Sequence, residues 1–420
     1  MKYNIAVIGG GPAGMMAAGR AGELGARAVL IEKNKNLGVK LLMTGNGRCN
    51  LTNLSGDDRK FIEKFGKNGK FLFSSLHQFG VSDVIEFFQK RGVKTKVEEK
   101  GKVFPASDRA NDVVAALVLY LKESGVKIGL GAEVKQIIKK KKTIEKIILA
   151  DDEEILADKF VMSTGGRSYP ETGSTGEAYF WLKELGHSIV ELRPALVPII
   201  IKDEIVKELE GISLADARIY VYKNNRKIYE ERGEAIFTKN GMSGPIILDL
   251  SGRIGKELPG KVDIKIDYIP DIDFKKLEEK MLQDFRREGN KFIKNYLDSI
   301  LPQKLAFAIL KLAQIDPEKR ANLIGREERK TLAHLLKEFS LEVEELEGFD
   351  MAVITSGGVK LNEVDPKTMK SKIVDNLYFA GEILDLDGPT GGYNLQVCWS
   401  TGRVAGESAA EGRKSGSSSS

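Results

Sequence analysis

The stretch NIAVIGGGPAG, residues 4–14, decides the fold class of this chain. Residues 4–8 are a short apolar run rich in branched side chains, which is typical of a buried parallel strand. Gly9, Gly11 and Gly14 follow with the spacing G-x-G-x-x-G and open a helix of small residues. The first glycine allows a tight turn, the second lets the backbone approach phosphates, and the third lets helix and strand pack closely.

The residues that follow complete a βαβ unit. The stretch ARAVLIEK, residues 26–33, predicts a second strand that ends at Glu32. An acid at this place accepts hydrogen bonds from an adenosine ribose, and the helix N-terminus supplies unpaired N–H groups for a pyrophosphate. A glycine turn that binds nothing is the alternative, which the complete βαβ context disfavours. We therefore expect an α/β, Rossmann-like domain, a parallel sheet with helices, that binds a dinucleotide.

The choice of dinucleotide depends on Pro12 and Ala13, which are common where FAD binds. No second G-x-G-x-x-G with strand and helix context occurs; Gly129 and Gly131 come close, but Val134 stands where the third glycine should be. We therefore expect one dinucleotide, FAD, on the Rossmann unit. The rest of the chain must supply its remaining contacts, with Lys33, next to Glu32, among them.

The domain organisation follows from a change in the sequence pattern at about residue 193, where stretches that predict antiparallel strands with polar turns begin. Residues 1–192 and 345–412 are expected to form a discontinuous FAD-binding domain, interrupted by an inserted domain over residues 193–344. The insert is divided into a β-rich part, 193–272, and a helical part, 273–344, and residues 413–420 are expected to be a flexible tail.

Three local patterns are specific enough to check. The stretch KNN, residues 223–225, predicts a hairpin turn. Residues 234–251, EAIFTKNGMSGPIILDLS, are interpreted as strand. Residues 111–125 predict an amphipathic helix with Asn111 or Asp112 as its cap.

The composition excludes several classes of protein. The 65 basic and 60 acidic residues give a net charge of +5, which is no nucleic-acid signature. Two cysteines, Cys49 and Cys398, make a disulfide framework unexpected and favour a reducing, cytoplasmic location. Three dispersed histidines assemble no zinc motif, so no metal is expected. No stretch approaches the ~20 apolar residues that span a bilayer, so no membrane partner is expected.

Seven ordered blocks of the chain resemble one family of bacterial flavoproteins. The blocks are VIGGGPAG (7–14), GVKLLMTGNGRCNLTN (38–53), GKVFPASDRANDV (101–113), STGGRSYPETGSTGEAY (163–179), FTKNGMSGP (237–245), TSGGVKLNEVDPKTM (355–369) and LYFAGEILDLDGPTGGYNLQ (377–396). They resemble the HI0933-like family, which includes aminoacetone-oxidase-like and NAD(P)/FAD-dependent oxidoreductases. The resemblance covers nearly the whole chain and implies non-covalently bound FAD.

The resemblance implies that the segment after Glu32 wraps the FAD. The residues concerned are Lys40, Gly45, Asn46, Gly47, Arg48, Cys49 and Asn50. Gly45 and Gly47 permit unusual φ angles and close approach of the backbone. Arg48 is expected to neutralise pyrophosphate charge or orient the loop, with a structural salt bridge as the alternative. For Cys49 we favour a small packed residue over a reactive thiol.

The resemblance also assigns residues to the two other parts of the cofactor site. Val134, Thr164, Gly165 and Gly166 are expected beside the adenosine half. Gly381 and Glu382 are expected near the ribityl chain or pyrophosphate. The last helix is expected to begin at Gly391, Gly392, Tyr393, Asn394, Leu395 and Gln396 and to point its N-terminus at the flavin, where its dipole would stabilise the negative charge of the reduced ring.

One position departs from the family pattern. The block FTKNGMSGP carries Lys239 where relatives commonly have histidine, while Ser243, Gly244 and Pro245 are retained. The lysine could replace the histidine or be a solvated turn residue. No catalytic acid or base is assigned from the sequence.

The expected function is an FAD-dependent oxidoreductase that acts on a small organic molecule. An NAD(P)H-linked reductase of an activated C=C bond, resembling the bile-acid enone reductases, is favoured, with NAD(P)H bound transiently. The alternatives are an oxidase of a small amine such as aminoacetone and a flavoprotein of RNA modification. Nucleic acid is not expected as a partner, and the oligomeric state is not predicted.

Overall fold

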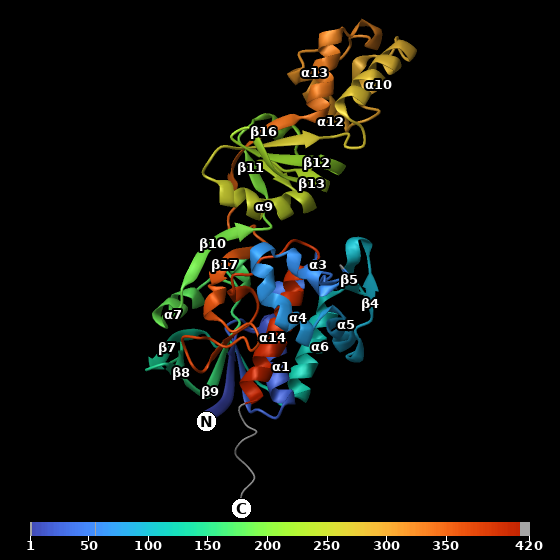
Figure 1. The fold of residues 1–420 in the computed structure, drawn as a ribbon. Coiled ribbons are helices and arrows are strands. Elements are labelled where there is room, and N and C mark those ends of the chain that lie inside the picture. Colours follow the sequence, from blue (N-terminus) through green and yellow to red (C-terminus); the bar gives the residue numbers. More distant parts are fainter. Residues whose placement is uncertain (1, 55, 412–420) are drawn as a thin grey trace, which may run out of the picture. The chain divides into compact units, whose positions relative to one another are not determined.

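The computed structural model describes residues 2–54 and 56–411, so the tail predicted for residues 413–420 lies outside the described residues. The described chain divides into two compact units (Figure 1). One comprises the residues up to Arg193 together with those from Val353 onward, and the other is Pro194–Ala352. Each unit has its own hydrophobic core.

A seven-stranded sheet forms the centre of the first unit. Its order is β6 (Lys127–Leu130), β2 (Ala28–Glu32), β1 (Lys2–Ile8), β9 (Glu154–Met162), β8 (Thr143–Leu149) and β7 (Val134–Lys140), with β18 (Leu377–Phe379) also paired to β9. Strands β6, β2, β1, β9 and β18 run parallel, while β8 is antiparallel to both of its neighbours. The predicted Rossmann-like parallel sheet is confirmed.

Three helices pack near the glycine turn: α1 (Pro12–Glu23), α6 (Ala110–Glu123) and α14 (Tyr393–Ala410). Helices α1 and α14 lie side by side, blue and red in Figure 1. A Cβ at Gly402 would lie 2.4 Å from the carbonyl oxygen of Ala13, and one at Gly406 2.2 Å from that of Ala17. Small residues therefore bring the two helix backbones into contact, which is why the sequence of α14 contains glycine within a buried helix.

The predicted helix at residues 111–125 is present as α6, but its cap is different. The residue at the N-cap is Arg109, and Asn111 and Asp112 lie inside the first turn. The side chain of Asp112 instead accepts a hydrogen bond from the Arg109 guanidinium at 3.1 Å. The capping prediction was therefore wrong by two to three positions, because the helix begins at Ala110, directly after the extended backbone of Arg109.

Shorter elements complete the unit. They are α2 (Val39–Met43), α3 (Asp58–Glu63), the 3-10 helix η1 (Gly66–Leu72), α4 (Phe73–Gln78), α5 (Val81–Lys90), α7 (Ala178–Glu184), η2 (Glu99–Gly101), η3 (Pro170–Thr172), η5 (Leu361–Glu363) and η6 (Gly381–Ile383). A three-stranded sheet has the order β3 (Thr52–Asn53), β5 (Lys102–Pro105), β4 (Thr95–Val97), and β10 (Ile189–Ala195) pairs with β17 (Ile354–Val359).

The second unit is a closed antiparallel barrel with attached helices. The strand order is β11 (Ile199–Ile201), β14 (Gly241–Ser243), β13 (Arg226–Phe237), β12 (Ser213–Lys223), β15 (Val262–Asp267) and β16 (Phe339–Leu346). Its helices are α8 (Ile205–Glu208), α9 (Pro245–Glu257), α10 (Phe274–Arg287), α11 (Ile293–Leu297), α12 (Gln303–Leu312), η4 (Ala321–Leu323) and α13 (Arg326–Lys337). The predicted hairpin turn is confirmed, since Asn224 and Asn225 join β12 to β13 with φ of 50° and 63°.

Two stretches of this unit differ from the prediction. Residues 245–251, interpreted as strand, begin helix α9, because Gly244 at φ 95° and Pro245 at the first helical position start a helix there. Residues 339–344, assigned to the helical part, form most of strand β16, whose buried residues alternate with polar ones. Because β16 closes the barrel, the chain returns to the first unit at residue 353 instead of residue 345.

Candidate functional site

The glycine turn after β1 is crowded at every glycine except one. A Cβ at Gly9 would lie 2.5 Å from the carbonyl oxygen of Ser163, and one at Gly14 would lie 1.9 Å from that of Gly9. A Cβ at Gly11 would have no atom of the described residues within 4 Å. Gly11 is also the N-cap of α1, with Pro12 as the first helical residue. The turn therefore leaves room beside the positive end of a buried helix.

Glu32 connects the end of β2 to this turn. Its carboxylate accepts hydrogen bonds from the backbone N–H of Gly10 and of Asn34, both at 2.7 Å, and the residue is buried. Lys33 points its ammonium at Glu177, 2.7 Å away, so its charge is balanced within the protein. The predicted ribose acid thus lies against the glycine turn, whereas Lys33 pairs with a residue from a distant segment.

The second glycine loop, residues 45–50, is a run of left-handed backbone. Gly45, Asn46, Gly47 and Cys49 have φ of 57°, 56°, 81° and 61°. The loop is closed by hydrogen bonds from Cys49 N–H to the Thr44 carbonyl at 2.9 Å and from the backbone N–H of residue 110 to the Gly47 carbonyl at 2.8 Å. Asn46 is exposed. Two of these four positions are not glycine, so hydrogen bonding and packing hold a conformation that the sequence alone disfavours.

Arg48 is held by an ion-pair network. Its guanidinium bonds to Glu98 and, at 2.8 Å, to Asp108, and it lies 4.0 Å from the centroid of the Phe104 ring. Lys96 bonds to Asp108 at 2.5 Å and joins the same network. These cations hold the pKa values of both carboxyls below their ordinary range. The structural salt bridge, named as the alternative for Arg48, is therefore what the structure contains.

Cys49 and Asn50 are both buried, with different chemistry. Burial raises the pKa of the Cys49 thiol to about 12, so the thiol is protonated at neutral pH. This agrees with a packed residue and not with a nucleophile. The Asn50 side-chain oxygen has no hydrogen-bond partner among the described residues. A buried acceptor of this kind is costly unless a ligand or water satisfies it.

A polar network surrounds Glu382. Its carboxylate bonds to the ammonium of Lys40 at 2.8 Å, to the hydroxyl of Ser168 at 3.1 Å and to the backbone N–H of Thr355 at 2.8 Å. Lys40 also donates to the Ser168 hydroxyl at 2.6 Å. Gly166 lies against this network, since a Cβ there would be 2.3 Å from the Thr355 hydroxyl. The structure thus brings together Lys40, Gly166 and Glu382, which were predicted for three different parts of the cofactor site.

Three residues predicted for the adenosine half lie in strand-to-turn segments. Val134 is the buried first residue of β7, and Ala132, two residues before it, donates its N–H to the Glu32 carbonyl at 2.9 Å. The buried hydroxyl of Thr164 has no partner among the described residues. Gly165 has φ 77°, and a Cβ there would lie 3.8 Å from Glu382. These segments therefore border both Glu32 and the network around Glu382.

Helix α14 begins at a glycine pair, and two of its predicted site residues have structural partners. Gly392 is its N-cap with φ 99°. The amide of Asn394 is bonded in both directions to the backbone of Gly388 at 2.9 Å. The amide of Gln396 is fully buried, accepts from Thr52 at 2.6 Å and donates to Ser400 at 2.9 Å. Asn394 therefore holds the turn that precedes α14, and Gln396 ties the helix to β3.

The start of α14 is also tied to the second glycine loop and to α3. Asn53 donates to the Gly391 carbonyl at 2.8 Å, and a Cβ at Gly392 would lie 2.9 Å from the Asn50 side-chain oxygen. The Tyr393 ring lies 4.9 Å from that of Phe61, centroid to centroid. Leu395 is partly buried at the edge of the first unit's core. The N-terminus of α14, whose first N–H groups have no partner within the helix, is therefore packed against residues from distant segments of the chain.

The sequence interpretation missed Ser168, Thr355 and Asn53, although all three lie in blocks that carry the family resemblance. Ser168 follows Gly166 by two positions, and Asn53 ends the segment that contains Asn50. For Ser168, its position near a predicted site glycine was the sequence signal that could have identified it; for Asn53, the signal was its position in the segment predicted to wrap the cofactor. No pattern in the sequence connects Thr355 to Glu382, because only the fold brings β17 to η6.

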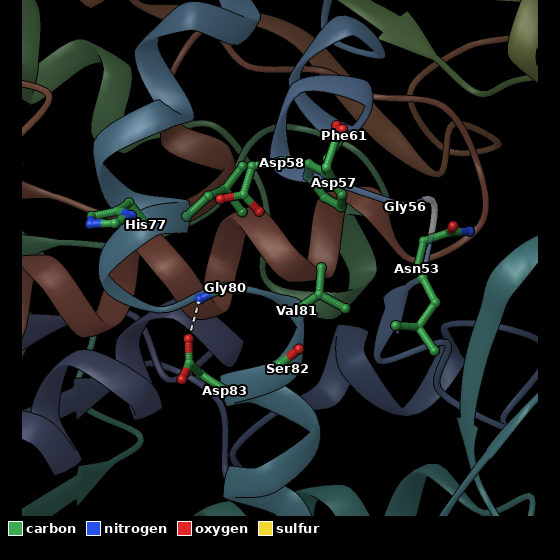
Figure 2. Close-up of a pocket in the computed structure, with 12 residues that line it drawn as sticks. Asn53, Gly56, Asp57, Asp58, Phe61, His77, Gly80, Val81, Ser82 and Asp83 are labelled. Carbon is green, nitrogen blue, oxygen red and sulfur yellow. Dashed lines mark hydrogen bonds between the residues drawn. The ribbon is translucent and has the colours of Figure 1, made fainter.

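A cavity of about 230 Å³ lies among α3, α4 and α5 of the same unit (Figure 2). Its lining includes Asn53, Asp57, Asp58, His77 and Asp83. Asp57 and Asp83 accept hydrogen bonds from backbone N–H groups at 2.9 and 2.8 Å, so both carboxylates cap the N-termini of helices. Among the described residues, no group of three or more His, Cys, Asp or Glu side chains is placed to hold a metal ion.

Lys239 lies in the second unit, in the turn between β13 and β14. It is exposed, and within the described part of the chain no ion pair is formed by its ammonium. Within residues 2–54 and 56–411, every helix is too short or too polar to cross a membrane.

The residues of the first unit fit a bound dinucleotide. Space remains over Gly11 at the N-terminus of α1, Glu32 ends the second strand, and the buried side-chain oxygens of Asn50 and Thr164 have no partner among the described residues. A parallel sheet with this turn, interrupted by an inserted unit, defines a Rossmann-type dinucleotide-binding protein.

The chain belongs to the HI0933-like family, whose model, described as "HI0933-like protein Rossmann domain", matches residues 3–408. It is an FAD-dependent oxidoreductase. It is 33% identical to the 3-dehydro-bile acid delta(4,6)-reductase of Clostridium scindens, over 97% of this chain and 99% of that protein. It is 30% identical to the ribosomal RNA dihydrouridine synthase of Escherichia coli, over 95% and 96%.

A solved structure supports the fold alone. The 3-ketosteroid delta1-dehydrogenase of Sterolibacterium denitrificans matches with a TM-score of 0.54 and 12% identity, over 97% of this chain and 99% of that one. The recognition of the family and of the FAD-binding fold from sequence is confirmed.

Proposed function

We propose that this protein is an NAD(P)H-linked, FAD-dependent reductase of a C=C bond conjugated to a carbonyl group. The names of two relatives support this. A 3-dehydro-bile acid with delta(4,6) unsaturation carries C=C bonds conjugated to its 3-keto group. Dihydrouridine is uridine without the ring C=C bond that is conjugated to a carbonyl. The substrates named differ in size and charge, but the reacting group is the same.

FAD, when bound, supplies hydride transfer at its ring. The residues of the first unit would hold it. The N-terminus of α1 at Gly11 would bind the pyrophosphate and Glu32 the adenosine ribose. Residues at the N-terminus of α14 would hold the ring, with the unpaired side-chain oxygen of Asn50 as an acceptor for an N–H donor.

The chain's own charges favour the reduced state of the site. The N-terminus of α14 carries partial positive charge, which stabilises an anion beside it. The ammonium of Lys40 is paired with Glu382 at 2.8 Å and bonded to Ser168 at 2.6 Å, so this pair adds hydrogen-bond donors in fixed positions but no net charge. These groups are in position before the reaction, so they need no reorganisation when negative charge develops.

The amine-oxidase alternative differs in its electron flow. An oxidase takes hydride from an amine such as aminoacetone and passes electrons to oxygen, whereas the proposed reductase takes them from NADH or NADPH. The two alternatives therefore predict opposite roles for the organic substrate. The similarity to a protein named as a reductase over nearly the full length of both chains favours the reductase.

The test is anaerobic photometry of the FAD-loaded protein. We expect NADH or NADPH to bleach the flavin absorbance, and a ketone with a conjugated C=C bond to restore it. The ketone series should include a 4-en-3-one steroid, and a uridine-containing RNA should be tried separately. Reduction by aminoacetone with peroxide formation in air, and none by NADH or NADPH, would overturn the proposal in favour of the oxidase.

A further inference from the structure

Strand β17 contains the motif TSGGV, residues 355–359, to which the sequence prediction assigned no role. Every residue of β17 is buried, although Thr355 and Ser356 are polar and two glycines follow them. Buried polar groups are costly unless they are hydrogen-bonded, and buried glycines add little to a hydrophobic core. The composition of this strand therefore requires an explanation other than core packing.

The two glycines bring the backbone of β17 against two other segments of the first unit. Gly357 has φ 90°, and a Cβ there would lie 2.2 Å from the carbonyl oxygen of Glu191 in β10. Gly358 has φ 137°, and a Cβ there would lie 2.7 Å from the carbonyl oxygen of Ile383, next to Glu382. A side chain fits at neither position, so β17 is in direct backbone contact with both β10 and the segment that carries Glu382.

Hydrogen bonds fix the register of β17 on the segment that carries Glu382. The N–H of Thr355 donates to the Glu382 carboxylate at 2.8 Å. Further along the strand, the N–H of Asp385 donates to the Val359 carbonyl at 3.2 Å, and Val359 is paired in parallel with Leu384. Contacts near both ends of β17 therefore determine where the Glu382 carboxylate lies.

The side chain of Thr355 holds a second segment of the predicted cofactor site. Its hydroxyl oxygen accepts hydrogen bonds from the backbone N–H of Arg167 at 2.7 Å and of Ser168 at 3.1 Å. Gly166 lies so close that a Cβ there would be 2.3 Å from this oxygen. A hydroxyl oxygen has two lone pairs, and here both accept from the backbone of one loop. The loop 166–168 is thus fixed on β17 by a fully buried oxygen atom.

The two segments that Thr355 holds also bond to each other. The Ser168 hydroxyl donates to the Glu382 carboxylate at 3.1 Å and accepts from Lys40 at 2.6 Å. Thr355 belongs to neither segment, and removal of its hydroxyl would leave two backbone N–H groups of the loop without their acceptor. Because buried hydrogen bonds in such a network depend on one another, the loop and the carboxylate would both shift.

We propose that Thr355 is a positioning residue for FAD, whose hydroxyl holds the loop 166–168 against the Glu382 carboxylate that its N–H binds. The inference rests on the proposed function only in that these segments bind FAD, and it needs no electron transfer. Thr355 acts through Gly166 and Glu382 and not by touching the cofactor. Strand β17, by which the chain re-enters the first unit at Val353, thereby aligns the cofactor segments.

The experiment measures FAD affinity by fluorescence titration of the FAD-free full chain, without NAD(P)H, together with its thermal unfolding. Thr355→Ser and Thr355→Cys both lack the γ-methyl group and differ in their acceptor atom, since sulfur accepts hydrogen bonds only weakly. Thr355→Val keeps the shape and removes the acceptor. The control is Ser251→Ala in the second unit, which removes a fully buried hydroxyl that accepts the Val197 N–H at 3.1 Å.

We expect FAD affinity to follow the acceptor at position 355 and not the stability of the variant. Thr355→Ser should bind FAD within about threefold of the unmodified protein, although the lost methyl group lowers its melting temperature. Thr355→Cys and Thr355→Val should bind FAD at least about tenfold more weakly, because the loop has lost its acceptor. Ser251→Ala should melt at a lower temperature with unchanged FAD affinity.

Equal FAD affinities of Thr355→Ser and Thr355→Cys would overturn the positioning proposal, whether or not Thr355→Val folds. A loss of FAD affinity in Ser251→Ala as large as that in Thr355→Cys would also overturn it, since affinity would then follow stability. Failure of flavin reduction by NADH and NADPH would overturn the proposed function and leave the ranking of FAD affinities intact. The two proposals therefore fail separately.

Discussion

Two glycine-rich segments of the first unit, residues 9–14 and 45–50, were both predicted to bind the cofactor, and the structure makes them different objects. The first is a turn between a buried strand and a buried helix, in which protein atoms fill the space beside Gly9 and Gly14 and leave it open beside Gly11. The second is a loop with four left-handed residues, exposed at residues 45–47 and buried at Cys49 and Asn50, and it is closed by its own hydrogen bonds and by the ion pairs of Arg48.

The difference teaches how to separate a binding glycine from a packing glycine. Gly14 is required by the protein itself, because the carbonyl of Gly9 occupies the place of a side chain. No described contact requires a glycine at position 11, and we propose that a ligand uses the space beside it. In the second loop Arg48, the residue expected to bind the cofactor, already has two carboxylate partners. The side-chain oxygen of Asn50 is the polar atom of this loop without a partner among the described residues.

The largest effect is expected for Gly14→Ala. Its Cβ would lie 1.9 Å from the Gly9 carbonyl oxygen, so the turn or α1 must move. Overpacking at buried positions costs about 1–3 kcal/mol, and a backbone clash of this size belongs at the upper end or beyond. Thermal unfolding of the FAD-free protein measures it. A melting temperature equal to that of the unmodified protein would show that the turn is not tightly packed.

Gly11→Ala is the matched change in the same motif. Its φ of −76° is ordinary for alanine, and its Cβ meets no described atom within 4 Å, so the FAD-free protein should melt within about a degree or two of normal. FAD affinity should fall at least about tenfold, or about 1.4 kcal/mol, because the methyl group occupies the approach to the phosphates. Titration of FAD followed by fluorescence gives the affinity. Unchanged affinity would place the pyrophosphate elsewhere.

The elements close to the first motif could be predicted because local rules determine them. The strand that ends at Ile8, the turn and the helix from Pro12 follow from an apolar run, glycine spacing and a helix-starting proline, all within 20 residues. The same is true of the Asn224–Asn225 turn, where two residues tolerant of positive φ join two strands.

Partners from distant segments could not be predicted. Arg48 finds Glu98 and Asp108, and Glu382 finds Lys40 and Thr355, only after folding, and no periodicity in the sequence records such pairs. The strand prediction for residues 245–251 failed for a different reason, since a short apolar run of branched residues suits a buried strand and a buried helix equally. There the Gly-Pro start, which was visible, decides for helix α9.

Arg48→Ala tests whether the second loop is structural. We expect a modest fall in melting temperature with FAD affinity nearly unchanged, because the guanidinium serves Glu98 and Asp108. Arg48 holds the pKa of Glu98 below its ordinary value of 4.5, and Lys96 and Arg48 hold that of Asp108 below 3.8. Carboxyls with lowered pKa values stabilise the folded state above their unfolded pKa values and lose this effect as the pH falls through the folded ones.

The melting-temperature difference between the unmodified protein and Arg48→Ala should therefore be constant above about pH 5 and shrink toward about pH 3. Arg48→Lys, which keeps the charge but not the bidentate geometry, should lie between the two. A large loss of FAD affinity in Arg48→Ala, with normal melting of the FAD-free protein, would show that Arg48 binds the cofactor instead.

The smallest effect is expected for Cys49→Ser. The thiol is buried with a pKa raised to about 12, and Cys398, the other cysteine, is buried with a pKa of about 12 as well. Neither should react with iodoacetamide at pH 8 until the protein unfolds, when both become reactive, because only the thiolate attacks. Cys49→Ser should keep its FAD and its activity, with a small loss of stability from the buried hydroxyl. Rapid labelling of Cys49 in the folded protein, identified by peptide mass spectrometry, would contradict this and make the thiol, not the glycines, the important group of the second loop.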